Sequence, residues 1–85
     1  MKTLYLIRHA KSDWSIDHLL DIDRPLNERG YGDAHKMSLI LNEKKIVPDL
    51  IISSPAVRAI STALIFCRNL NHVPIAILIN KNLYD

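Results

Sequence analysis

The stretch P-D-L-I-I-S-S-P-A-V-R-A-I-S-T-A, residues 48–63, contains the elements that decide the predicted fold. Asp49 to Ser53 is a short, largely apolar run, typical of a strand buried on both faces of a sheet. Ser54 and Pro55 follow as a preferred N-cap and a preferred first helical residue, so a helix is predicted from here to about Leu70. The apolar residues expected on its inner face are Ala59, Ile60, Ala63, Leu64 and Cys67. A strand that leads directly into a helix is the building unit of parallel sheets.

The same two kinds of element occur on either side of this stretch. Thr3 to Ile7 is a second apolar run that predicts a strand, and Ile75 to Ile79 predicts another. Asn27 is the expected N-cap of a helix to about Glu43, although two nearby glycines leave a later beginning open. The expected inner positions of this helix are Ala34, Met37, Ile40 and Leu41. The order strand, helix, strand, helix, strand predicts an α/β fold in which helices cover a parallel sheet.

The length of 85 residues, with 48% hydrophobic and 24% charged residues, predicts one small soluble domain over residues 1–85. The net charge of +2 is scattered along the chain, which argues against a nucleic-acid partner because such proteins concentrate basic residues on one face. No apolar run approaches the roughly 20 residues of a membrane span, so we expect no membrane association and a cytoplasmic location. The single cysteine, Cys67, excludes an intramolecular disulfide, and its apolar neighbours predict a buried thiol.

Reactive side chains follow the predicted strands at the ends that parallel strands share. Arg8 and His9 come directly after the first strand, and Arg58 lies one helical turn beyond the second. Arginines beside a helix N-terminus can bind phosphate oxygens, and a neutral imidazole can attack phosphorus near pH 7. The three residues therefore predict a phosphate pocket at one edge of the sheet. Their spacing alone leaves open a structural role for His9 and a solvated surface role for Arg58.

Three motifs give a more specific indication. They are L-Y-L-I-R-H-A-K-S at 4–12, D-R-P-L-N-E-R-G at 23–30, and the stretch at 48–63. Together they closely resemble the histidine phosphatase superfamily, also called the phosphoglycerate mutase-like family, and R-H-A-K-S resembles its branch of SixA-like phosphohistidine phosphatases. The resemblance implies a phosphoglycerate mutase-like fold and hydrolysis of a phosphorylated substrate through a covalent phosphohistidine. It implies neither a metal nor a cofactor.

The resemblance also implies roles for particular residues. His9 matches the family nucleophile, and Arg8 and Arg58 match two catalytic phosphate ligands. Ser15 lies where mutase-like relatives carry a small polar phosphate ligand. Asp85 is a candidate proton donor, with a frayed terminal residue as the alternative. The implied partner is a protein that carries phosphohistidine; a small phosphorylated metabolite as substrate, and a non-catalytic phosphate-binding module, are the alternatives.

One part of the family's pattern is missing from this sequence. Members normally continue for as many residues again, and a later strand supplies a second histidine to the phosphate pocket. His72 cannot take this role because it precedes a predicted strand instead of following it. The sequence therefore predicts the N-terminal half of such a domain, and a short chain that binds phosphate without efficient turnover is the alternative. A homodimer could cover the apolar surface that a half domain leaves exposed.

Overall fold

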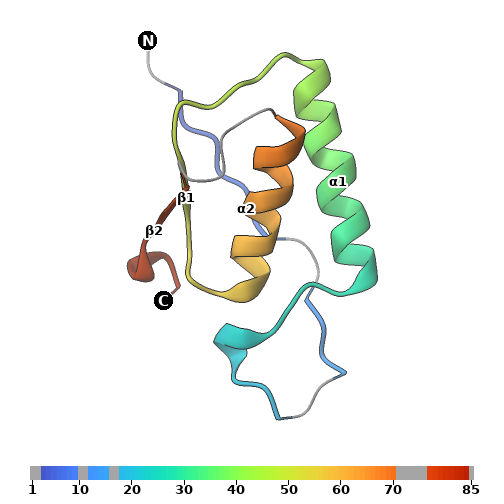
Figure 1. The fold of residues 1–85 in the computed structure, drawn as a ribbon, viewed down its shortest axis with the longest axis vertical. Helices are drawn as coiled ribbons and strands as arrows, with labels where there is room; N and C mark the ends of the chain where they lie inside the picture. Colours follow the sequence, from blue (N-terminus) through green and yellow to red (C-terminus); the bar gives the residue numbers. More distant parts are fainter. Residues whose placement is uncertain (1–2, 10–11, 16–17, 71–76, 85) are drawn as a thin grey trace.

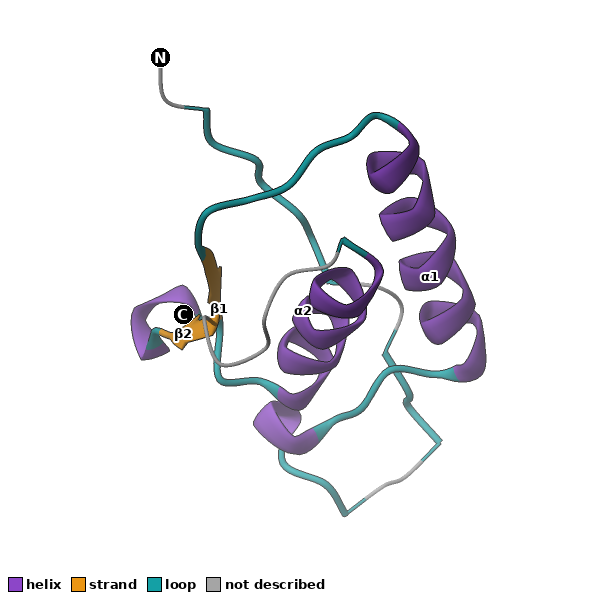
Figure 2. Ribbon diagram, turned by 45° about the horizontal axis from the view of Figure 1, so that its top comes forward, coloured by secondary structure: helices purple, strands orange, loops and turns teal. Residues whose placement is uncertain are grey.

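The structure is a computed structural model that describes residues 3–9, 12–15, 18–70 and 77–84. Helix α1 spans Glu28–Glu43 and helix α2 spans Val57–Asn69. Strand β1, Ile51–Ser53, and strand β2, Ile77–Ile79, are short. The helix α2 lies between α1 and the strand pair (Figure 1), and a second view shows the same order (Figure 2). Within the described ranges, no helix combines the length and the apolarity that crossing a bilayer requires.

The two strands are parallel, as the sequence predicted. Their register pairs Ile51 with Ile77 and Ser53 with Ile79, and the Asn80 N–H donates to the Ser53 carbonyl oxygen at 2.9 Å. Along the chain α2 lies between them, which is the order of a βαβ unit. Both strands therefore end at the same edge, and the segments that follow them approach each other. This arrangement confirms the predicted α/β class.

The prediction of a strand over Thr3 to Ile7 is wrong. The described part of the chain contains a two-stranded sheet that excludes this segment, and Leu4 and Leu6 are 81% and 88% exposed. An apolar run forms a strand only where a neighbouring strand supplies hydrogen-bond partners, and the run itself carries no information about that neighbour. The segment instead lines one side of a cavity of about 370 Å³, whose other side α1 and α2 form. The predicted first residue of β2, Ile75, lies outside the described residues.

Helix α1 begins where its predicted cap places it. The Asn27 Oδ1 accepts a hydrogen bond from the Gly30 N–H at 2.7 Å, and the helix starts at Glu28, so the later start is excluded. Its expected inner face is only partly correct, because Met37 and Ile40 are 53% and 41% exposed. The buried residues are small: Gly30, Ala34 and Ser38. These small side chains allow α2 to pack closely against α1. A prediction from the spacing of apolar residues does not select glycine or serine, so it missed two of these positions.

Gly32 lies on the opposite, exposed face of α1. A Cβ atom added there would meet no atom within 4 Å, and its φ is not positive. Glycine in an exposed helix interior costs conformational entropy, so Gly32→Ala is expected to raise the free energy of unfolding by about 0.5–1 kcal/mol. Thermal unfolding should show a midpoint increase of about 2–8 °C. A lower midpoint would contradict the exposed position of this residue.

The C-terminus of α1 is closed by a Schellman motif. The Lys45 N–H donates to the Asn42 carbonyl oxygen at 2.9 Å, and the Ile46 N–H donates to the Leu41 carbonyl oxygen at 3.2 Å. This motif needs a left-handed residue, and Lys45 has a φ of 57°. An L-residue in this conformation is strained by roughly 1–2 kcal/mol, which glycine avoids.

Lys45→Gly is therefore expected to stabilise the protein by about 0.5–1 kcal/mol, measured by denaturant unfolding. The neighbouring Lys44 has an ordinary φ of −81° and is the matched control. Lys44→Gly is expected to lower the stability, because there glycine brings added chain entropy without relief of strain. Equal effects of the two substitutions would show that the left-handed conformation carries no cost.

Helix α2 begins two residues later than predicted, with Ala56 as its N-cap. Ser54 still contributes, since its Oγ accepts from the Ala56 N–H at 3.1 Å. Cys67 is fully buried, as predicted, and burial raises the pKa of its thiol.

The buried face of α2 is only partly the predicted one. Besides Cys67, the buried residues of the helix are Thr62, Ile65 and Phe66. The predicted Leu64 is 39% exposed, and the predicted Ala59, Ile60 and Ala63 are half-buried. Because α2 lies between α1 and the strand pair, its buried surface is wider than its apolar stripe, and the stripe alone does not predict it. The core consists of Leu26, Ala34, Ile65, Phe66 and Leu70, with Leu41 packed against it.

Candidate active site

Four chain segments meet beside the edge where both strands end. His9 follows the N-terminal segment, and Asp21 begins a 3₁₀ turn at Asp21–Asp23. Arg58 lies in the first turn of α2, and Tyr84 follows a second 3₁₀ turn at Lys81–Leu83. The Asn80 Oδ1 caps this last turn by accepting from the Asn82 N–H at 3.0 Å. Arg58 follows β1 and Tyr84 follows β2, so the parallel pairing of the two strands brings these two side chains to the same edge of the sheet.

The structure brings His9 and Arg58 together. The Nε–H of Arg58 donates to the Nε2 of His9 at 3.3 Å, across 49 positions in the chain. A ring nitrogen that accepts a hydrogen bond carries no proton, so this contact assigns a neutral imidazole with its proton on Nδ1. The sequence analysis placed these two residues at one sheet edge, and they lie in direct contact. A neutral imidazole nitrogen beside a guanidinium is an arrangement suited to a phosphoryl group.

Asp21 binds the other end of the Arg58 guanidinium. One terminal nitrogen of Arg58 donates to the Asp21 carbonyl oxygen at 2.7 Å, and the other donates to the Asp21 Oδ2 at 3.0 Å. The hydroxyl of Tyr84 donates to the same Oδ2 at 2.7 Å. The hydrogen bonds from Tyr84 and then Arg58 hold the pKa of Asp21 below its usual range, and the contact with Asp21 raises the pKa of Tyr84. At neutral pH the carboxylate is therefore ionised and the phenol is protonated.

A second arginine, Arg24, lies on the far side of the Asp21 carboxylate. Its Nε is 3.9 Å from the Asp21 Oδ1, and its side chain is only 11% exposed. The guanidinium lies 3.7 Å from the centre of the Trp14 ring and donates to the Asp13 carbonyl oxygen at 3.0 Å. These contacts hold the loop before α1 against the site. Asp21 thus lies between two guanidinium groups.

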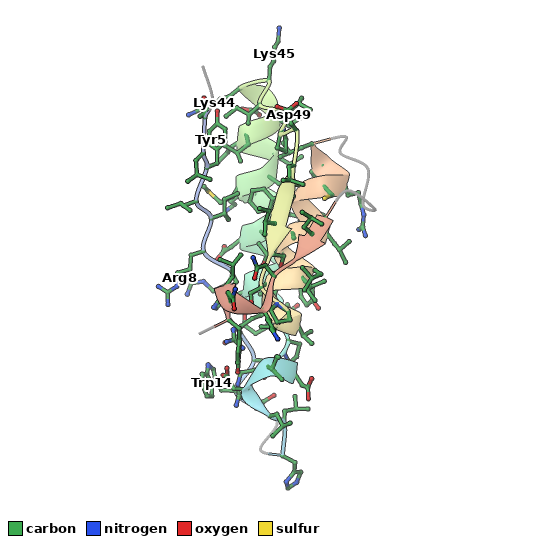
Figure 3. The ribbon with its side chains drawn as sticks, turned by 90° about the vertical axis from the view of Figure 1, so that its left-hand side faces the viewer. Tyr5, Arg8, Trp14, Lys44, Lys45 and Asp49 are labelled. Atoms are coloured by element: carbon green, nitrogen blue, oxygen red, sulfur yellow. The ribbon has the colours of Figure 1, made fainter. Side chains whose placement is uncertain are left out.

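Of the other predicted site residues, Arg8 and Ser15 form no hydrogen bond with His9, Asp21, Arg58 or Tyr84 in the described part of the chain. The side chain of Arg8 is exposed and points outward from the ribbon (Figure 3). The residue also contributes to the lining of the cavity beside the N-terminal segment. Ser15 is exposed, and its N–H and hydroxyl donate to the Asp13 carboxylate at 2.7 and 2.6 Å, which lowers the pKa of Asp13. Asp85 lies outside the described residues. The roles of Arg8, Ser15 and Asp85 stay predictions from the resemblance.

Sequence reasoning missed three residues of the cluster: Asp21, Arg24 and Tyr84. The spacing of Asp21 and Arg24 offered a signal, because residues three apart in a 3₁₀ turn lie above one another. No pattern in the sequence singled out Tyr84, whose contact with Asp21 spans 63 positions. Among the described residues, no group of three histidine, cysteine, aspartate or glutamate side chains is placed to hold a metal ion.

The fold and this cluster define an α/β protein with an imidazole and a guanidinium in contact at the carboxyl edge of parallel strands. The chain belongs to the histidine phosphatase superfamily (branch 1), whose model matches residues 4–83. A solved structure of a protein assigned as the phosphohistidine phosphatase SixA from Agrobacterium tumefaciens shares the fold, with a TM-score of 0.84 and 33% identity. The match covers 93% of this chain and 50% of that one. The resemblance derived from the three motifs is thereby confirmed.

Two curated relatives extend the comparison. An uncharacterised chloroplast protein of Arabidopsis thaliana is 44% identical over 61 residues, which are 72% of this chain and 28% of that protein. A 2,3-bisphosphoglycerate-dependent phosphoglycerate mutase of Clavibacter michiganensis is 38% identical over 64 residues, which are 73% of this chain and 26% of that protein. The chain thus spans about a quarter of the length of these relatives and half of the SixA structure.

Proposed function

We propose that the protein hydrolyses a phosphorylated substrate through a covalent phosphohistidine on His9, and that the substrate is phosphohistidine on another protein. The observation that carries this proposal is the contact between the His9 Nε2 and the Arg58 Nε–H. It places an unprotonated ring nitrogen beside the cation that would bind the phosphoryl oxygens. The 33% identity with the SixA structure supports the choice of substrate.

In the proposed reaction, the incoming phosphoryl oxygens take over the Arg58 Nε–H, which releases the lone pair of the His9 Nε2. That lone pair forms a bond to phosphorus while the bond from phosphorus to the substrate's imidazole nitrogen breaks. The leaving nitrogen keeps the electron pair and takes a proton, for which Asp85 is the donor predicted from the resemblance. Water then attacks phosphorus and gives a proton to the Asp85 carboxylate, while the bond from phosphorus to the His9 Nε2 breaks. Inorganic phosphate leaves, and neutral His9 is restored. Arg58, with Arg8 and Ser15 as further predicted ligands, would stabilise the charge on the oxygens during both transfers.

The second candidate is a phosphomonoesterase that acts on a small phosphorylated metabolite. The 38% identity with a phosphoglycerate mutase favours it. The two candidates differ in the leaving group, because an imidazole nitrogen leaves more readily than an alkoxide and needs less help from an acid.

Trapping of the phosphoenzyme tests the proposal. The protein as its own cell produces it is mixed with a phosphohistidine protein, with a phosphomonoester in a parallel reaction, and quenched in alkali. We expect phosphate bound to His9 that is stable in alkali and released in acid, formed faster from the phosphohistidine protein. Faster labelling by the phosphomonoester would favour the second candidate. Hydrolysis without any acid-labile phosphoprotein would overturn the covalent mechanism, and binding of phosphate without hydrolysis would leave a non-catalytic phosphate-binding module.

A further inference from the structure

The Asp21 carboxylate and the Tyr84 hydroxyl lie behind Arg58, on the side away from His9. We propose that Asp21 is a positioning residue that holds the Arg58 guanidinium in the orientation for phosphoryl transfer, and that Tyr84 positions Asp21. This inference rests on the proposed function, since it concerns the same transfer to His9. Neither residue was singled out by the motifs of the sequence.

The contacts fix the plane of the guanidinium. Arg58 uses its Nε–H for His9 and one N–H of each terminal nitrogen for Asp21. A guanidinium is rigid and planar, so three hydrogen bonds directed to two sides leave it no freedom to rotate. Donors that are already oriented toward the developing charge need no reorganisation during the reaction. Asp21 accepts two of these three hydrogen bonds. One acceptor is its backbone carbonyl oxygen, whose position does not depend on the rotamer of the side chain.

Tyr84 fixes the remaining freedom, which is rotation of the Asp21 carboxylate. Its O–H donates to the Oδ2 at 2.7 Å, the same oxygen that accepts from Arg58. The carboxylate of Asp21 is 51% exposed, so water would otherwise compete for this oxygen. A hydrogen bond to an ionised acceptor is stronger than a neutral one, and the phenol stays a donor because its pKa is raised. Hydrogen bonds thus connect Tyr84 to Asp21, Asp21 to Arg58, and Arg58 to His9 without a gap.

A different role for Asp21 gives the opposite kinetic result. A carboxylate on Arg58 could compete with the phosphoryl group for the guanidinium and so block the site. If Asp21 blocks, its removal raises the affinity for phosphate and the turnover together. If Asp21 positions, its removal lowers kcat while the affinity for phosphate is unchanged or higher, because the guanidinium keeps its charge but loses its orientation. The split between kcat and phosphate affinity therefore separates the two roles.

The test uses Asp21→Asn and Tyr84→Phe in the protein as its own cell produces it, with Asp23→Asn as the matched control. Asp23 is an exposed carboxylate in the same 3₁₀ turn. We expect Asp21→Asn to lower kcat by about 10- to 100-fold, since small misplacements of a catalytic group cost up to about 100-fold. Tyr84→Phe should lower kcat by about 3- to 10-fold, the loss expected for one hydrogen bond. Asp23→Asn should leave kcat unchanged, and the Kd for inorganic phosphate, titrated by phosphorus NMR, should not rise in any of the three.

A second readout does not depend on turnover. The Nε–H of Arg58 has its own proton–nitrogen NMR signal, which we expect to be slow in exchange in the unchanged protein and in Asp23→Asn. The signal should broaden or exchange rapidly in Asp21→Asn, and partly so in Tyr84→Phe. If the unchanged protein forms no phosphoenzyme, the proposed function fails while this signal still tests the positioning.

Three outcomes would overturn the inference. An unchanged Arg58 signal in Asp21→Asn would show that the Asp21 carboxylate does not hold the guanidinium. A kcat that rises together with the phosphate affinity would assign a blocking role. Equal kcat values in Asp21→Asn and Asp23→Asn would leave no role beyond surface charge. Should Asp21→Asn lose its folded circular-dichroism spectrum, Tyr84→Phe, which removes one hydroxyl group, decides the question alone.

Discussion

Replacing His9 by alanine is expected to abolish phosphoenzyme formation and to lower kcat by at least about 10³-fold. The substitution removes the Nε2 atom that would form the bond to phosphorus, and among the described residues no other histidine is hydrogen-bonded to Arg58. The affinity for inorganic phosphate should change by only a few-fold, because Arg58 keeps its hydrogen bonds to Asp21. Rapid-quench labelling measures the first effect, and a phosphate titration measures the second.

The matched control for this substitution is His18→Ala. His18 is an exposed histidine in the loop before α1, so its loss should change neither labelling nor kcat. Hydrolysis that persists in a clean His9→Ala preparation would rule out His9 as the nucleophile. A large loss in both variants would point to a general effect on folding, which circular dichroism would reveal.

Replacing Arg58 by alanine is expected to lower kcat/KM by about 10²- to 10³-fold, the loss typical of one group that stabilises charge in the transition state. The side chain is 15% exposed and contacts both His9 and Asp21, so the substitution removes a cation held directly beside the His9 Nε2. Arg58→Lys should show most of the same loss. A lysine keeps the charge but has no planar group that could reach the His9 nitrogen and both Asp21 oxygens at once.

Arg68→Ala provides the control for the loss of positive charge. Arg68 is an exposed arginine in the last turn of the same helix, and its removal should leave kcat/KM unchanged. Water screens the ion pair of Arg58 with the half-exposed Asp21, so the pair contributes little to stability and Arg58→Ala should remain folded at room temperature. Equal kcat/KM values for the two variants would contradict the role of Arg58.

Much of the fold could be predicted from local signals. Asn27 capped the first helix where expected, because the hydrogen bond between its side chain and the Gly30 N–H depends on neighbouring residues alone. The parallel pairing of β1 and β2 followed from the order of the elements. Local signals could not show that Thr3 to Ile7 forms no strand, because strand formation depends on a partner strand elsewhere in the chain. The prediction of the buried helix faces was partly wrong for a related reason. Ser38 and Thr62 have polar side chains, so hydrophobicity does not indicate that they are buried, but neighbouring elements pack against them.

The candidate site shows the same division. Arg58 and His9 could be paired from the sequence because each was expected to follow a strand, and the ends of parallel strands converge. The two residues do lie in contact, although the segment before His9 forms no strand. Asp21 and Tyr84 could not, because each belongs to a short turn whose position depends on distant contacts. Arg8 was expected in the same pocket because it adjoins His9, and its role there stays a prediction from the resemblance.

The separation of Tyr84 from Asp21 along the chain has a consequence for the kinetics of folding. Closing a loop of 63 residues costs about 4 kcal/mol of chain entropy, more than one hydrogen bond between these side chains returns. The contact therefore depends on prior pairing of β2 with β1, which brings the last turn to the edge of the sheet. Refolding should produce helical circular dichroism first and a protected Arg58 side chain later. During partial unfolding the order is reversed, so the orientation of the guanidinium is lost while both helices are still intact.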